Sequence, residues 1–264
     1  MILVACLTAP APAQQVGGAE KAAFAGIFGW WLPAASPHAR PAVVALHGCG
    51  GLYGRGRDLN ERHRAMAQLL GARGCHVLFP DSLTPRGLRE LCTLPLANRP
   101  LRAADRRFDI QAAIEWLMER PQVDRARIAI LGWSHGGGAV LSTLSHPTRA
   151  RAAVAFYPGC STFARGRYSP SAPLLILIGA LDDWTPPAPC VELGKRSAGV
   201  TVRVLADSYH DFDHPSARVR VRNDVPGGVN PGAGVTVGAN PRARARRRTR
   251  RCLNSWSASC ADAA

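Results

Sequence analysis

The sequence contains no run of about 18 consecutive apolar residues, the length that a helix needs to cross a bilayer. It contains no internal repeat, and it has few acidic residues, since 18 Asp and Glu face 33 Lys and Arg. We therefore expect neither a membrane span nor a repeat architecture. The 264 residues, 47% of them hydrophobic, predict one packed globular domain, because two domains of ordinary size would not fit.

The formal net charge of +15 is concentrated near the end of the chain. Seven arginines lie there with no acidic residue between them: Arg242, Arg244, Arg246, Arg247, Arg248, Arg250 and Arg251. A tether for nucleic acid or a membrane surface is one interpretation of such a charge. We instead expect residues 223–264 to be an irregular, disordered tail that reflects a shifted reading frame or a degenerate end, and we expect no nucleic-acid partner.

The first ten residues form a short apolar run, and residues 11–14 follow with the small-x-small form of a signal-peptidase site. No Lys or Arg precedes this run, so the printed start would lie inside a longer signal peptide, and a core strand is the alternative. We expect residues 1–13 to be a signal peptide, residues 20–222 to be the folded domain, and the protein to be periplasmic or secreted.

Export permits disulfide bonds. Four cysteines lie in or beside predicted loops where bridges could form: Cys49, Cys92, Cys160 and Cys190. Their pairing cannot be predicted from the sequence. Cys75 opens an apolar segment instead, and we expect it to be a buried free thiol.

Short apolar segments alternate with longer segments of helical period between residues 41 and 205. Strands are predicted at residues 43–46, 75–79, 128–131, 152–157, 174–178 and 200–205, and helices at 58–73, 104–121 and 137–145. This alternation is typical of an α/β fold with a mostly parallel central sheet and helices on both faces. The long connection at residues 80–101 is expected to form the rim of a site at the carboxyl ends of the strands.

A Gly-Trp-Ser-His-Gly motif at residues 132–136 joins a predicted strand to a predicted helix. A sharp turn of this kind lifts a serine hydroxyl clear of the sheet, and its glycines remove side chains that would clash. The motif makes Ser134 the candidate nucleophile. A glycine-rich helix start without a catalytic role is the alternative.

Residues 47–51, His-Gly-Cys-Gly-Gly, follow the strand predicted at 43–46. Hydrolytic enzymes with a serine turn of this type take one oxyanion donor from this place and the other from the residue after the nucleophile. We therefore assign the two donors to the backbone amides of Cys49 and His135. A tight turn with no catalytic role is the alternative.

Acidic and basic candidates follow later strands. Asp182 and Asp183 come after the strand at 174–178, and we favour Asp182 as the residue that orients the base, leaving Asp183 to cap the helix that begins near residue 186. His210 lies in the loop after the last predicted strand and is the candidate base, with His214 as its rival. The other histidines have no partner at ligand spacing, so we expect no metal site.

The order Ser134, Asp182, His210 is that of the α/β-hydrolase fold. With the motifs at residues 47–51, 81–87, 132–137, 178–186 and 209–215, the chain resembles the dienelactone hydrolase family over residues 42–240, and specifically its exported members with a serine at the turn. The resemblance implies hydrolysis of a small-molecule carboxylic ester or lactone without a cofactor. The name-giving enzymes carry cysteine where this chain has Ser134.

The resemblance also suggests substrate contacts. Arg86 is similar to an arginine that could face a substrate carboxylate, although a solvated loop arginine is equally compatible with the sequence. Tyr53, Trp133 and Trp184 could form an aromatic wall, with core packing as the alternative. Family members resemble one another in a final amphipathic helix, which the arginine-rich end of this chain lacks.

Two other functions remain open at this point. A protein that keeps the fold without turnover could act as a binding module, and a missing final helix makes this interpretation more plausible. An exported peptidase on the same fold would need a substrate-gating domain, for which the 264 residues leave no room.

Overall fold

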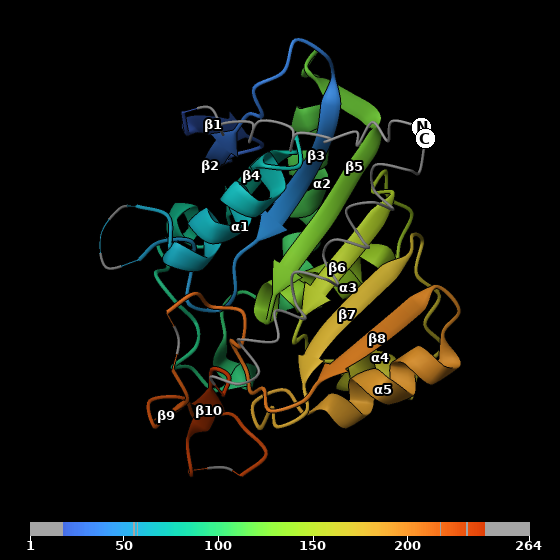
Figure 1. The fold of residues 1–264 in the computed structure, drawn as a ribbon. Helices are drawn as coiled ribbons and strands as arrows, with labels where there is room; N and C mark the ends of the chain where they lie inside the picture. The colour runs from blue at the N-terminus through green and yellow to red at the C-terminus, as the bar shows by residue number, and fades with distance from the viewer. Residues whose placement is uncertain (1–17, 55, 57, 217, 231, 241–264) are drawn as a thin grey trace, which may run out of the picture.

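A computed structural model describes residues 18–54, 56, 58–216, 218–230 and 232–240. Its centre is an eight-stranded sheet in the order β1-β2-β4-β3-β5-β6-β7-β8 (Figure 1). The last six strands in that order run parallel to one another, whereas β1 and β2 pair antiparallel. The strands are β1 (Glu20–Phe24), β2 (Ile27–Leu32), β3 (Arg40–Leu46), β4 (His76–Asp81), β5 (Val123–Trp133), β6 (Ala152–Phe156), β7 (Leu174–Gly179) and β8 (Val200–Leu205).

The predicted α/β architecture is confirmed, and all six predicted strands are present. The hairpin of β1 and β2 was not predicted. Its two-residue turn places Ala25 and Gly26 at φ values of 47° and 76°, and only the glycine is a residue that favours such a turn. The prediction for β5 also began five residues late, because Asp124, Arg125 and Arg127 interrupt its apolar pattern.

The helices cover both faces of the sheet. In the part of the chain that the structure describes they are α1 (Glu61–Gly71), α2 (Arg107–Met118), α3 (His135–Leu144), α4 (Ser161–Arg165) and α5 (Pro187–Arg196), with the short 3₁₀ helices η1 (Thr84–Arg86), η2 (Leu96–Asn98) and η3 (Ala103–Arg106). The chain steps from β3 to β4 through α1 and then back across the sheet from β4 to β5 through α2. Because such crossovers are right-handed, α1 lies on one face and α2 on the other (Figure 1).

The chain winds from β3 toward one edge of the sheet and from β5 toward the other edge, and this change of winding direction determines where a site can form. These two strands are neighbours in the sheet, so the loop after β3 and the turn after β5 meet at its carboxyl edge. The strand cores that position them are fully buried; Val44, Leu46, Ile130 and Leu131 have no exposed surface. Rigid, close-packed strands thus support both loops.

The segment after β8 differs from its prediction. Residues 223–230 and 232–240 do not form a separate tail, because β9 (Arg220–Arg222) pairs with β10 (Val235–Val237) and a cluster of Val225, Val235 and Val237 packs on Trp184. The predicted domain boundary at residue 222 is therefore too early. The arginine-rich residues 242–251 lie outside the described residues, as do residues 1–13, so the predictions for both remain untested. Within the described ranges, no helix is long and apolar enough to cross a membrane.

Two buried histidines make the fold sensitive to acid. Burial lowers the pKa of His63 to about 3, and the neighbouring Arg62 cation adds to this effect. Burial and then the Arg106 cation lower the pKa of His135 to about 3 as well. In the unfolded chain both groups titrate near pH 6.5. Between these limits the unfolded chain binds more protons than the folded one, so stability falls as the pH drops.

We expect the free energy of unfolding to fall by up to about 1.4 kcal/mol per pH unit for each of these histidines below about pH 6.5. Urea unfolding between about pH 7 and pH 4.5, where most carboxylates stay ionised, measures this slope. A His63→Asn variant should show a shallower dependence. A denaturation midpoint that stays constant over this range would contradict the prediction.

Candidate active site

Ser134 lies at a strained turn between β5 and α3. Its backbone has φ 51° and ψ −112°, a conformation that is rare for a residue with a side chain. A Cβ atom on Gly132 would overlap the carbonyl of Gly136, and one on Gly136 would overlap the carbonyl of Leu46. The two glycines therefore allow the turn to pack against itself and against β3. The Ser134 amide donates to the carbonyl of Phe156 at 2.9 Å, which ties the turn to β6.

His210 and Asp182 form a buried pair. The Nδ1 atom of His210 lies 2.9 Å from Oδ2 of Asp182, and 1% of the imidazole side chain and none of the carboxylate side chain is exposed. The amides of Trp184 and Thr185 donate to Oδ1 of Asp182 at 3.0 and 2.8 Å. With its carboxylate so oriented, Asp182 accepts a hydrogen bond from the Nδ1–H group of His210, which leaves the lone pair on Nε2. Nε2 is buried and has no hydrogen-bond partner in the described part of the chain.

The two aspartates after β7 point to different partners. The Asp183 carboxylate accepts hydrogen bonds from the amide and the hydroxyl of Thr236, each at 2.8 Å. It does not cap α5, whose N-terminus has no side-chain cap. Of these two aspartates, Asp182 contacts the imidazole of His210, whereas Asp183 connects β10 to the loop after β7.

The loop that carries His210 is fixed from several sides. The imidazole of His210 packs against Tyr157 and Trp184, whose ring centroids lie 4.4 and 4.6 Å from its own. Asp211 pairs with Arg62 at 2.8 Å, and Asp213 accepts from the hydroxyl of Tyr157 at 2.6 Å. The backbone carbonyl of His210 accepts from the amide of Gly238. The rival His214 lies farther along the loop, with its Nδ1 atom 3.4 Å from the amide of Ser216.

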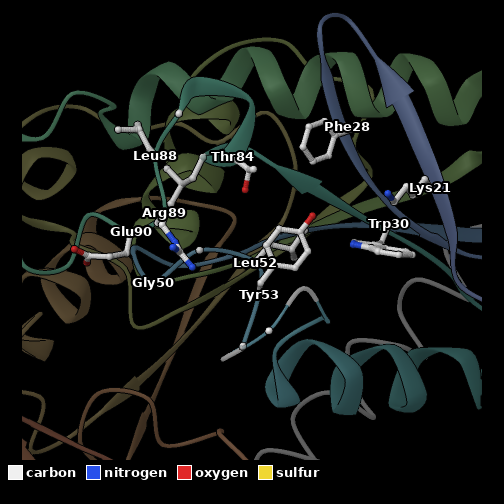
Figure 2. Close-up of a pocket in the computed structure, with 15 residues that line it drawn as sticks. Lys21, Phe28, Trp30, Gly50, Leu52, Tyr53, Thr84, Leu88, Arg89 and Glu90 are labelled. Atoms are coloured by element: carbon white, nitrogen blue, oxygen red, sulfur yellow. The ribbon is translucent and has the colours of Figure 1, made fainter.

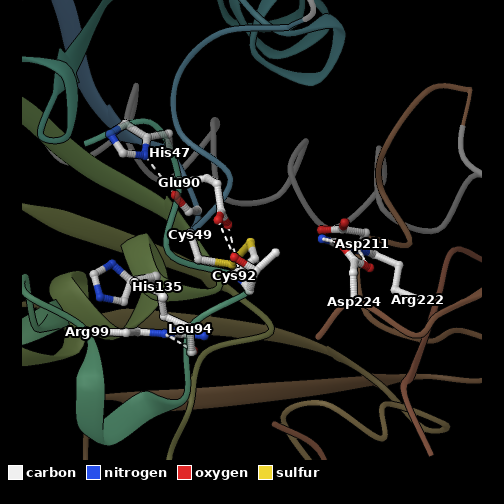
Figure 3. Close-up of a disulfide and its surroundings, with 12 residues drawn as sticks. His47, Cys49, Glu90, Cys92, Leu94, Arg99, His135, Asp211, Arg222 and Asp224 are labelled. Atoms are coloured by element: carbon white, nitrogen blue, oxygen red, sulfur yellow. Dashed lines mark hydrogen bonds and ion pairs between the residues drawn. A yellow bond between two sulfur atoms is a disulfide. The ribbon is translucent and has the colours of Figure 1, made fainter. Parts of the chain in front are cut away.

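The loop after β3 lies beside the turn that holds Ser134. A Cβ atom on Gly48 would lie 3.7 Å from the Cβ atom of Ser134. Cys49 follows in this loop and forms a disulfide with Cys92, while its carbonyl accepts from the amide of Leu91 at 2.8 Å (Figure 3). The disulfide thus fastens the loop to residues 80–101, the connection that was predicted to form the rim.

A second disulfide joins Cys160, just before α4, to Cys190 in α5. Cys75 is free and buried, as expected from its place before an apolar strand. All four loop cysteines are therefore paired with one another, although the sequence left their pairing open. Two disulfides are consistent with an exported protein.

A cavity of about 460 Å³ opens beside Ser134. Its lining includes His135, Trp184 and Phe163, and residues 227–228 complete one side of it. Arg99, which pattern analysis did not single out, also reaches this cavity, and its Nε atom donates to the carbonyl of Leu94 at 3.2 Å. The size is sufficient for a small organic molecule.

Three predicted substrate contacts lie elsewhere. Trp133 is fully buried in the core, where its Nε1 donates to Asp213 at 2.7 Å. Arg86 does not line the cavity, because its guanidinium binds the Asp109 carboxylate at 2.7 and 3.1 Å. Tyr53 lines a different cavity, of about 800 Å³, with Trp30 and Phe28 (Figure 2). Of the four residues predicted to contact substrate, only Trp184 lines the cavity beside Ser134.

Residues 32–246 match the model of the dienelactone hydrolase family. The chain belongs to this family. The match includes the turn at Ser134, the loop after β3 and the pair of Asp182 and His210, and it identifies the protein as a hydrolase. A comparison with curated proteins finds no match.

Solved structures share the fold. A protein of Klebsiella pneumoniae assigned to the dienelactone hydrolases is 17% identical, with a TM-score of 0.64 over 88% of this chain and 92% of its own. A dienelactone hydrolase-like promiscuous phosphotriesterase from metagenomic libraries is 21% identical, with a TM-score of 0.58 over 94% and 98%. Esterase 2 of Thermogutta terrifontis, phosphorylated by paraoxon, is 17% identical, with a TM-score of 0.57 over 77% and 88%. These similarities show the α/β-hydrolase fold.

Proposed function

We propose that this family member hydrolyses a carboxylic ester or lactone through an acyl-enzyme on Ser134. The observation that carries the proposal is the buried His210 imidazole, which is oriented by Asp182 at 2.9 Å and whose Nε2 has no hydrogen-bond partner among the described residues. A base of this kind needs a nearby hydroxyl to act on. The strained turn presents Ser134 at a cavity that Trp184, a direct neighbour of the imidazole, also lines.

In the proposed cycle, Nε2 of His210 takes the proton of Ser134 as the serine oxygen attacks the substrate carbonyl. The amides of Cys49 and His135 donate hydrogen bonds to the oxyanion of the tetrahedral intermediate. The imidazolium then protonates the departing alcohol oxygen, and the C–O bond breaks to leave the acyl-enzyme. A water molecule loses a proton to the same imidazole, attacks the acyl carbon and releases the carboxylic acid, returning the proton to Ser134.

Active-site labelling tests the proposal. The Ser134 oxygen should attack the phosphorus of a fluorophosphonate and expel fluoride, and peptide mass mapping should find the added phosphonyl group on that residue alone. Excess of a small aryl ester should slow the labelling, and protein unfolded in urea should not react. An unlabelled native protein would instead favour a binding module, whereas labelling together with faster turnover of a peptide than of an ester would favour a peptidase.

We also propose that the protein is exported. The pairing of all four loop cysteines supports this, because disulfides of this kind persist in oxidising compartments and are rare in the cytosol. Thiol titration of protein recovered from the periplasm or the medium, in the presence of denaturant, should find Cys75 as the only free thiol among the described cysteines. Recovery of the protein solely in the cytosol with reduced cysteines would contradict export.

A further inference from the structure

Arg106 is a fully buried arginine at the end of η3. Its Nε atom donates to Oγ of Ser82 at 3.0 Å. Its Nη1 atom donates to the carbonyl of His47 at 2.8 Å and lies 3.2 Å from Nδ1 of His135. The second terminal nitrogen, Nη2, is buried and has no hydrogen-bond partner among the residues that the structure describes.

No carboxylate within the described ranges lies at ion-pair distance from this guanidinium. Asp109 is the acid whose charge acts on it most strongly, but that carboxylate is bound by both terminal nitrogens of Arg86. Burial lowers the pKa of Arg106 to about 10, which still leaves the group charged at neutral pH. A buried cation without a carboxylate partner is costly, and costly groups of this kind are concentrated at functional sites.

Arg106 contacts both segments of the proposed oxyanion hole, the first through the backbone carbonyl of His47 and the second through the imidazole ring of His135. His47 lies two residues before Cys49, and His135 directly follows Ser134. Other bonds hold each segment separately, whereas one nitrogen of Arg106 contacts both of them. Since Nη1 donates, Nδ1 of His135 accepts, which also fixes the orientation of that ring.

Resting on the proposed function, we infer that Arg106 is a positioning residue that holds the two oxyanion donors in register and favours negative charge on the tetrahedral intermediate. A fixed positive charge in a water-poor interior acts more strongly on a developing oxyanion than it would in water. The charge on the intermediate is absent from the bound ester, so the effect belongs to the chemical step.

The test compares Arg106→Met, Arg106→Gln and Arg106→Lys with Arg86→Met. Arg86 is a matched control, because it also binds the Ser82 segment, through the carbonyl of Ser82, but has no contact with His47 or His135. For a small aryl ester we expect kcat of Arg106→Met to fall about 100-fold while KM stays within about threefold. Lysine should restore part of kcat and glutamine should not, while Arg86→Met should lower the unfolding midpoint without lowering kcat.

Far-ultraviolet circular dichroism and urea unfolding identify the folded variants, and Arg106→Gln takes the place of Arg106→Met if the latter does not fold. An unchanged kcat in either folded variant, or a rise in KM that accounts for the whole loss, would overturn the role of Arg106. Wild-type protein that neither turns over the ester nor labels at Ser134 would instead overturn the proposed function, so the two failures are distinguishable.

Discussion

Replacing Ser134 with alanine should lower kcat for a small aryl ester by about 10⁶-fold, to the level that the remaining site supplies. The variant lacks the oxygen that would form the acyl-enzyme, so neither His210 nor the oxyanion donors can compensate. Folding should be retained, because alanine at φ 51° is no more strained than serine and the Ser134 amide keeps its bond to Phe156.

Ser142 provides the matched control for this experiment. It lies in α3 and lines the same cavity as Ser134, but its own φ and ψ are helical and it does not occupy the strained turn. Steady-state kinetics on both variants, at equal urea midpoints, should give a large loss for Ser134→Ala and less than about a tenfold change for Ser142→Ala. Wild-type turnover by a folded Ser134→Ala protein would refute the acyl-enzyme mechanism.

The sheet could be predicted from the sequence because each of its parallel strands is a short apolar segment with its own boundary signals. The hairpin of β1 and β2 could not, since its turn uses Ala25 rather than Asn or Gly at a positive φ. The predicted helix at 58–73 began three residues early, because Asn60 caps α1 by accepting from the amide of Arg62.

Long-range contacts explain the errors in the predicted substrate residues. Trp133 follows the rule that successive strand residues point to opposite faces, which places its ring in the core between Phe156 and His63. Arg86 finds its carboxylate in Asp109, 23 residues later in the chain. No local pattern reveals such a partner, so an arginine that binds a substrate and one that binds an aspartate look alike in sequence.

Sequence patterns likewise fail to reveal residues that support the site without bearing a reacting atom. Arg106 belongs to a run of charged residues at 105–107 that resembles an exposed helix start, yet its side chain is completely buried. Residues 223–240 appeared irregular because glycine and proline carry no periodicity, although Gly238 binds the backbone of His210 and residues 227–228 line the cavity. Both features depend on which segments meet in three dimensions.

The adjacent aspartates offer a sharper test of the site than any single substitution. Asp182→Asn should lower kcat by roughly 10⁴-fold, because an amide in this position donates to Nδ1 or loses its bond to it. Either change removes the orientation that leaves the lone pair on Nε2 of His210. The backbone amides of Trp184 and Thr185 can still bind the remaining oxygen of the asparagine, so the loop should keep its shape.

Asp183→Asn is the same substitution at the next residue, since it also replaces a carboxylate with an amide. Its carboxylate binds Thr236 and not the imidazole, so we expect kcat within about tenfold of wild type and a loss of stability of about 1 kcal/mol. Kinetics and urea unfolding of the two variants together measure both effects. Equal losses of kcat in the two variants would show that both substitutions act by disturbing the conformation of the loop after β7. A loss confined to Asp182→Asn would assign the effect to the hydrogen bond between Asp182 and His210.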